Sequence, residues 1–141
     1  MNDLSIARQT LEEKGLTLAI VKNGNIIFTS TERGIYPLFN IVNEMASQLK
    51  GSSVADKVTG KAAAMLYKHA GISELYTNLI SEKATEVLKD TPFLLEYGLS
   101  VPYIKNRDKS GMCPVESLSS GIDNISDLMA GISEFLQRIR R

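Results

Sequence analysis

The first stretch whose residue types could carry out chemistry is Ser53-Val54-Ala55-Asp56-Lys57, which precedes an alanine-rich apolar stretch ending at Gly71. Ser53 three residues before Asp56 fits a capping box, so we predict one central helix from about residue 53 to Gly71. The free N–H groups and macrodipole of a helix N-terminus attract anions. Asp56 is therefore a candidate catalytic acid or base, and Lys57 a candidate cation for an anionic substrate group. The structural alternative is a capping carboxylate beside a solvated lysine.

A second polar stretch follows the last predicted strand. Asn106-Arg107-Asp108 has turn-forming chemistry, and Cys113-Pro114 predicts a short helix with Cys113 as its N-cap. A thiol at a helix N-terminus has its thiolate stabilised, which makes Cys113 a candidate catalytic nucleophile. The structural alternatives are an inert, packed cysteine and a turn with an internal ion pair. The candidate substrate-binding residues of the two stretches are Ser53, Thr59, Lys61, Asn106, Arg107 and Asp108.

Composition argues against several classes of protein. The 141 residues include 16 basic and 16 acidic ones, so the chain lacks the basic excess of a general nucleic-acid-binding or membrane-surface protein. One Cys and one His cannot supply a three-ligand Cys/His zinc site, and we predict no metal and no cofactor. No apolar run approaches the ~20 residues of a membrane span. The N-terminus lacks the pattern of a signal peptide, and a single cysteine suits a cytoplasmic protein.

The order of the predicted elements indicates the fold class. Asn23-Gly24 is the preferred centre of a type I′ turn, so the strands on either side of it form a hairpin. A hairpin that leads into βαβ units gives a mixed sheet with helices on both faces, which is a three-layer α/β/α sandwich. We place it in one domain of residues 1–141. Besides the hairpin and the central helix, the predicted helices are at 3–14, from 37, at 81–88 and from 114. The predicted strands are at 72–77 and 93–97, with 101–104 either a further strand or a continuation of the last one.

The last predicted helix, at about 122–140, is amphipathic. Its apolar stripe at helical spacing consists of Ile122, Ile125, Leu128, Met129, Ile132, Leu136 and Ile139. Such a stripe could dock a partner or a second copy of the chain. A homo-oligomer formed through this helix is therefore one expectation, and a pure interaction protein is one functional class.

One set of segments carries a resemblance beyond these patterns, at residues 19–24, 32–34, 53–58, 60–64, 80–82, 101–104, 106–108 and 113–114. Together these segments resemble a small bacterial family of uncharacterised proteins in the cytidine deaminase-like superfamily. The order of hairpin, long helix, strand, helix and strand is similar to that fold. The resemblance covers about residues 16–118 and leaves out the C-terminal helix. It implies a fold and a site location but no reaction.

Deaminases of this fold hold zinc through a His- or Cys-x-Glu motif at the helix after the hairpin and a Pro-Cys-x-x-Cys motif after the next strand. The corresponding places in this chain hold Ala55-Asp56-Lys57 and Ile80-Ser81-Glu82-Lys83, which offer no thiolate or imidazole. The resemblance is therefore to a family without the zinc motifs. A zinc-dependent deaminase is not predicted.

Two functions follow from these residues. We predict that residues 53–59 and the loop at 106–113 line one pocket at an edge of the sheet, because loops at the carboxyl ends of strands gather ligands. A zinc-independent enzyme acting on a small polar or anionic molecule, nucleotide-like ones included, would use that pocket. The alternative is a non-catalytic ligand-binding or regulatory module on the same scaffold.

Overall fold

The computed structural model of the chain describes residues 2–106 and 109–139. Within these residues it has five strands and seven helices. In chain order they are α1 (Asp3–Glu13), β1 (Leu18–Lys22), β2 (Asn25–Ser30), α2 (Tyr36–Glu44), α3 (Ala46–Leu49), β3 (Ser53–Thr59), α4 (Lys61–Ala70), β4 (Glu74–Ser81), α5 (Glu82–Leu88), β5 (Leu94–Val101), α6 (Pro114–Ser119) and α7 (Ile125–Ile139).

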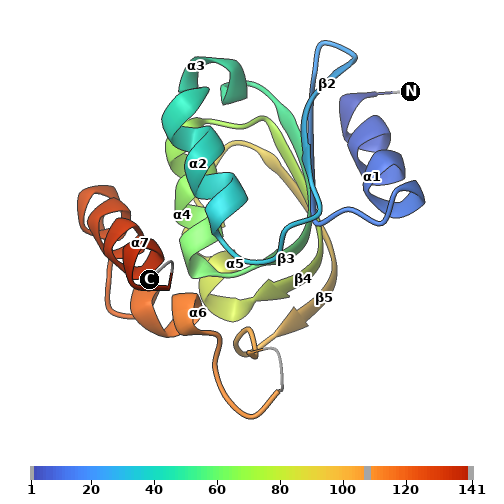
Figure 1. Cartoon of the computed structure of the whole chain (residues 1–141). Coiled ribbons are helices and arrows are strands. Elements are labelled where there is room, and N and C mark those ends of the chain that lie inside the picture. The colour runs from blue at the N-terminus through green and yellow to red at the C-terminus, as the bar shows by residue number, and fades with distance from the viewer. Residues whose placement is uncertain (1, 107–108, 140–141) are drawn as a thin grey trace.

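The strands form one mixed sheet in the order β2-β1-β3-β4-β5. Strand β1 pairs antiparallel with β2 and β3, whereas β3, β4 and β5 run parallel. Helix α1 covers one face of the sheet, and α2 to α5 lie on the opposite face (Figure 1). The predicted three-layer α/β/α architecture with a mixed sheet is confirmed, and so is an additional C-terminal helix.

Two apolar clusters, one on each face of the sheet, hold these layers together. On the α1 face, Leu4, Ala7 and Leu11 pack against the small side chains of β1 and β3. On the other face, α4 contributes Ala62, Ala63, Ala64 and Leu66 to a larger cluster. The alanines let α4 lie close to the sheet, because short side chains reduce the distance between the two layers.

The hairpin and several boundaries agree with the sequence predictions. Asn23 and Gly24 have φ angles of 52° and 79°, as a type I′ turn requires. Helix α5 matches its predicted range, and Cys113 is the N-cap of α6, with Pro114 at the first position. The strand predicted at 93–97 is the start of β5, which continues to Val101, and residues 102–104, predicted as part of a fifth strand or a continuation, lie outside it.

The predicted central helix is wrong in its first third. Residues 53–59 form β3, and the helix α4 begins only at Lys61. The predicted capping box is absent, because the hydroxyl of Ser53 donates to Glu74 Oε1 at 2.7 Å. Strand β3 lies between β1 and β4 and packs on both faces, with Val54 in one apolar cluster and Ala55 in the other. Pairing on both edges and burial on both faces outweigh a local capping pattern.

None of the helices described at residues 2–106 and 109–139 is long and apolar enough to cross a membrane.

Candidate functional site

Glu116 on α6 lies at the carboxyl ends of β3 and β4, buried from solvent. Its carboxylate accepts the N–H of Lys61 at 3.0 Å, the N–H of Ile104 at 2.7 Å and the hydroxyl of Ser81 at 3.4 Å. Lys61 is the first residue of α4 and Ser81 is the N-cap of α5. The chain's own carboxylate therefore occupies the place between two helix N-termini where an anion is favoured.

Gly60 permits this close approach. A Cβ atom at Gly60 would lie 3.2 Å from Glu116 Oε1 and 3.3 Å from Ile104 Cγ1. A side chain at this position would press on the carboxylate and on the chain that leads into α6.

Asp56 lies inside the core between β3 and α4. The hydroxyl of Tyr67, on α4, donates to Asp56 Oδ2, and the N–H of Val58 donates to Oδ1 at 3.3 Å. The hydroxyl of Thr59 lies 3.3 Å from Oδ2 and 3.0 Å from the hydroxyl of Thr77 on β4. These contacts make a small polar network in an otherwise apolar layer.

Burial changes the acidity of both members of the Asp56–Tyr67 pair. Burial raises the pKa of Asp56 from 3.8 to about 6, although the hydrogen bonds from Tyr67 and Val58 lower it. Burial and the nearby Asp56 charge raise the pKa of Tyr67 well above its usual value. Burial thus moves the pKa of Asp56 toward the range in which a general acid or base works, but the residue is only 9% exposed.

Of the other predicted residues of the first stretch, Thr59 contacts Asp56, whereas Lys57 and Ser53 lie elsewhere. Lys57 is exposed, since neighbouring side chains of a strand point to opposite faces and Asp56 faces α4. Ser53 begins β3 and Thr59 ends it, which separates them by roughly 20 Å of extended chain. Because the helical first turn does not exist, Ser53 and Lys57 are not gathered around Asp56, whereas Thr59 contacts it from the end of β3. Their roles in binding or catalysis stay predictions.

The second predicted stretch contains a turn that is held by hydrogen bonds within the stretch itself. The side-chain oxygen of Asn106 accepts the N–H groups of Ser110 at 3.0 Å and Gly111 at 3.3 Å, which supports the turn interpretation. Arg107 and Asp108 lie outside the described residues. Cys113 is half-buried and caps a helix of six residues, which is too short for a strong macrodipole. A nucleophilic role for Cys113 stays a prediction.

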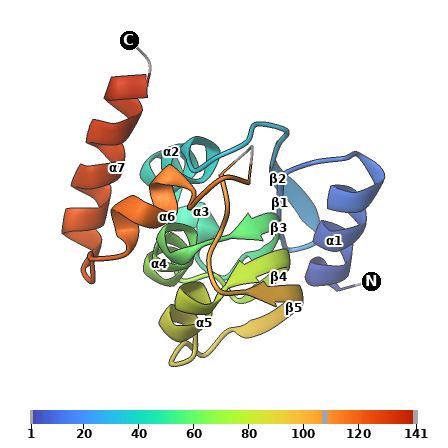
Figure 2. The ribbon, with the colours of Figure 1, turned by 90° about the horizontal axis from the view of Figure 1, so that it is seen from below.

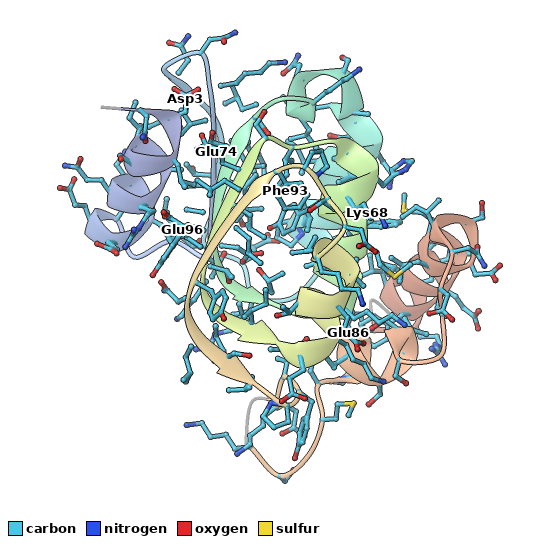
Figure 3. All side chains as sticks on the ribbon, turned by 180° about the vertical axis from the view of Figure 1, so that it is seen from behind. Asp3, Lys68, Glu74, Glu86, Phe93 and Glu96 are labelled. Atoms are coloured by element: carbon cyan, nitrogen blue, oxygen red, sulfur yellow. The ribbon has the colours of Figure 1, made fainter. Side chains whose placement is uncertain are left out.

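A polar groove of about 350 Å³ lies between α4, α5 and the segment that joins α6 to α7. Its apolar floor comes from Met65, Val87 and Ile125, and its polar lining comes from Lys61, Lys68, His69, Glu86, Asp90 and Asp123. Figure 3 shows Lys68 and Glu86 on the flank of the molecule next to α7. The volume falls in the range of small-molecule sites.

Lys61 is one of the residues that line this groove. The side chain is 9% exposed, and Nζ donates to Asp123 Oδ1 at 3.1 Å and to the carbonyl of Ser120 at 3.3 Å. An ammonium group has three donors, so these two contacts with described residues leave one for a ligand.

The groove unites few of the residues predicted from sequence. Lys61 lines it, whereas Asp56 lies within the core and Cys113 lies at the start of α6. Five residues outside the predicted site are part of the observed one. Lys68, His69 and Asp123 line the groove, Tyr67 contacts Asp56, and Glu116 accepts the N–H of Lys61. The spacing of Lys61, Met65 and Lys68, four and three residues apart, is the one sequence signal that places groove residues on a common helix face.

Within residues 2–106 and 109–139, no three His, Cys, Asp or Glu side chains lie close enough together to hold a metal ion.

The fold and the site define a mixed, five-stranded α/β protein with a polar groove over its helical layer. The chain matches the family model TM1506, described as a domain of unknown function (DUF1893), over residues 6–136, and it belongs to this family. It is also similar to the crystal structure of a DUF1893 family protein from Thermotoga maritima. That match has 27% identity and a TM-score of 0.86, and it covers 94% of this chain and 89% of the other. None of the curated proteins matches the chain.

Proposed function

We propose that the protein binds a small polar molecule in the groove between α4 and α5. The observation that supports this proposal is the Lys61 side chain, which lines the groove, is 9% exposed and has one ammonium donor beyond its two described contacts. Lys68 adds a second cation, and the apolar floor suits a ring or a carbon chain. A ligand with one anionic group and several hydroxyl or amino groups fits best, because Glu86 and Asp90 accept hydrogen bonds and repel further negative charge.

A nucleoside monophosphate has these features, which keeps nucleotide-like ligands within the proposal. The zero net charge supports a small ligand over general nucleic-acid binding. The cytoplasmic setting and the cytidine deaminase-like relationship, inferred from the single cysteine and from the sequence resemblance, also remain part of the proposal.

The experiment is a thermal-shift screen of nucleoside monophosphates, nucleobases, sugar phosphates and amino acids, followed by calorimetry on the best compound. We expect Lys68→Ala to weaken binding by about ten- to a hundredfold, since hydrogen bonds to charged groups contribute ~1.5–3 kcal/mol. The matched control is Lys83→Ala, an exposed lysine on α5 that does not line the groove. A screen without a hit, or an equal loss in both variants, overturns the proposal.

A zinc-independent enzyme is the second candidate, favoured by the proton affinity of Asp56 near neutral pH. Incubating a bound compound with the protein and separating the products by chromatography distinguishes the two functions. An enzyme consumes the compound and loses turnover in Asp56→Asn, whereas a binding module leaves it intact.

A further inference from the structure

Strand β5 is a free edge of the sheet. Among the strands described at residues 2–106 and 109–139 its one partner is β4, and Figure 2 shows β5 as the outermost strand, opposite β2. The strand is eight residues long. An edge strand of this length presents a row of unpaired backbone N–H and C=O groups, which is a template for pairing with another strand.

The sequence of β5 lacks the features that usually protect such an edge. It contains no proline or lysine, and three large apolar side chains are exposed: Leu94 (50%), Tyr97 (48%) and Leu99 (60%). Its one charge, Glu96, pairs with Arg8 of α1 at 3.7 Å. The opposite edge differs, because the register of β2 on β1 shifts between Ile20 and Val21. Such irregularities discourage edge-to-edge pairing.

We propose that β5 pairs antiparallel with β5 of a second copy of this chain, which joins the two sheets across a twofold axis. A register centred on Gly98 places Tyr97 opposite Leu99 of the partner subunit and Glu96 opposite Ser100 of the partner subunit. Apolar side chains then meet apolar ones, and the two Glu96 carboxylates do not face each other. In this register the strand matches itself, apolar against apolar with no like charges opposed, which favours a second copy over a charged peptide. Twofold pairing is the commonest symmetry of oligomers.

The pairing also extends an apolar row that crosses the sheet. Val58, Leu79 and Leu99 are register partners on β3, β4 and β5, and Val58 and Leu99 are both exposed. A second strand beside β5 lengthens this row and covers Leu99, which is the most exposed of the three. The inference is independent of the groove, whose lining comes from α4, α5 and the segment between α6 and α7.

The test is the mass of the protein by light scattering during gel filtration, over a range of concentrations. We expect a dimer for the wild type and a monomer for Leu99→Lys at the same concentrations. The matched control is Ile26→Lys, which places the same charge at a 46%-exposed apolar position on the opposite edge and leaves the dimer intact. A monomeric wild type, or a Leu99→Lys protein that remains dimeric, overturns the proposal. Dissociation by Ile139→Lys but not by Leu99→Lys places the interface on α7 and overturns it as well.

Hydrogen exchange on the wild type tests the pairing without a variant, so the result does not depend on whether Leu99→Lys folds. The amides of β5 become more protected as protein concentration rises if the strand pairs with its copy. Protection of β5 that does not change with concentration contradicts the pairing.

Discussion

Burial determines the chemistry of Asp56 more than its sequence neighbours do. As a helix cap it would have been a solvated carboxylate beside Lys57, with a low pKa. In the core it faces Tyr67 and Thr59, and its pKa rises to about 6. The same carboxyl group is thereby poorly placed to meet a substrate from solvent and well placed to make stability depend on pH.

We predict that Asp56→Asn removes one pH-dependent component of stability. The pKa of Asp56 is about 6 in the folded chain, against 3.8 for an unperturbed aspartate, so the folded state binds this proton more tightly. The resulting stabilisation is complete below about pH 4 and is lost as the pH rises through about 6, a change on the order of 3 kcal/mol. Urea unfolding from about pH 4 to pH 7 measures it as the difference between wild type and variant.

The control for that measurement is Glu12→Gln, an exposed carboxylate on α1. It should follow the wild-type dependence of unfolding free energy on pH. Parallel curves for wild type and Asp56→Asn would show that Asp56 does not titrate in this window.

At the level of elements, the hairpin, α5, the N-cap of α6 and the layered architecture could be predicted from sequence, because each depends on local chemistry. Asn23 and Gly24 adopt positive φ angles wherever they form such a turn. The segment at 53–59 could not be assigned this way, since its strand conformation depends on pairing with β1 and β4. The predicted site at Asp56 and Lys57 depended on the same helical turn, which does not exist, so its geometry could not be predicted either.

The partners that define the observed site come from far along the chain. Lys61 donates its N–H to a carboxylate 55 residues away, on α6. No local pattern distinguishes Glu116 from an ordinary acidic residue in the first turn of a helix. Only the packing of α6 against α4 shows that Glu116 connects α4, α5 and the chain after β5.

We expect Glu116→Ala to lower the free energy of unfolding by about 2–6 kcal/mol. The variant leaves the buried N–H groups of Lys61 and Ile104 without an acceptor, at about 1–3 kcal/mol each. Chemical denaturation measures the loss. The matched control, Glu134→Ala on the exposed side of α7, should change stability by less than ~0.5 kcal/mol. Equal stabilities for the two variants would mean that the carboxylate does not fasten α6 to the sheet.

For the molecule as a whole, the two sides of the sheet are covered unequally. One helix, α1, lies on one face, while α2 to α5 cover the other and α6 and α7 pack outside α4 (Figures 1 and 2). The groove therefore lies on the thick side of the molecule, where α4 and α5 meet the segment before α7. The free edge at β5 lies at the end of the sheet.

Helix α7 packs against the helical layer and buries Leu128, Ile132 and Leu136 of its apolar stripe in the core. These three residues are therefore not available to contact a partner. Leu128 and Ile132 are fully buried, whereas Ile139 is 60% exposed. We predict that Ile132→Ala costs about 2–5 kcal/mol of unfolding free energy, because it leaves a cavity between α7 and the core. Ile139→Ala makes the same chemical change on the same helix and should cost less than ~0.5 kcal/mol. Thermal and urea unfolding of both variants measure this difference. A small, equal effect would mean that α7 is a separable arm, and its stripe would again be available for docking a second copy.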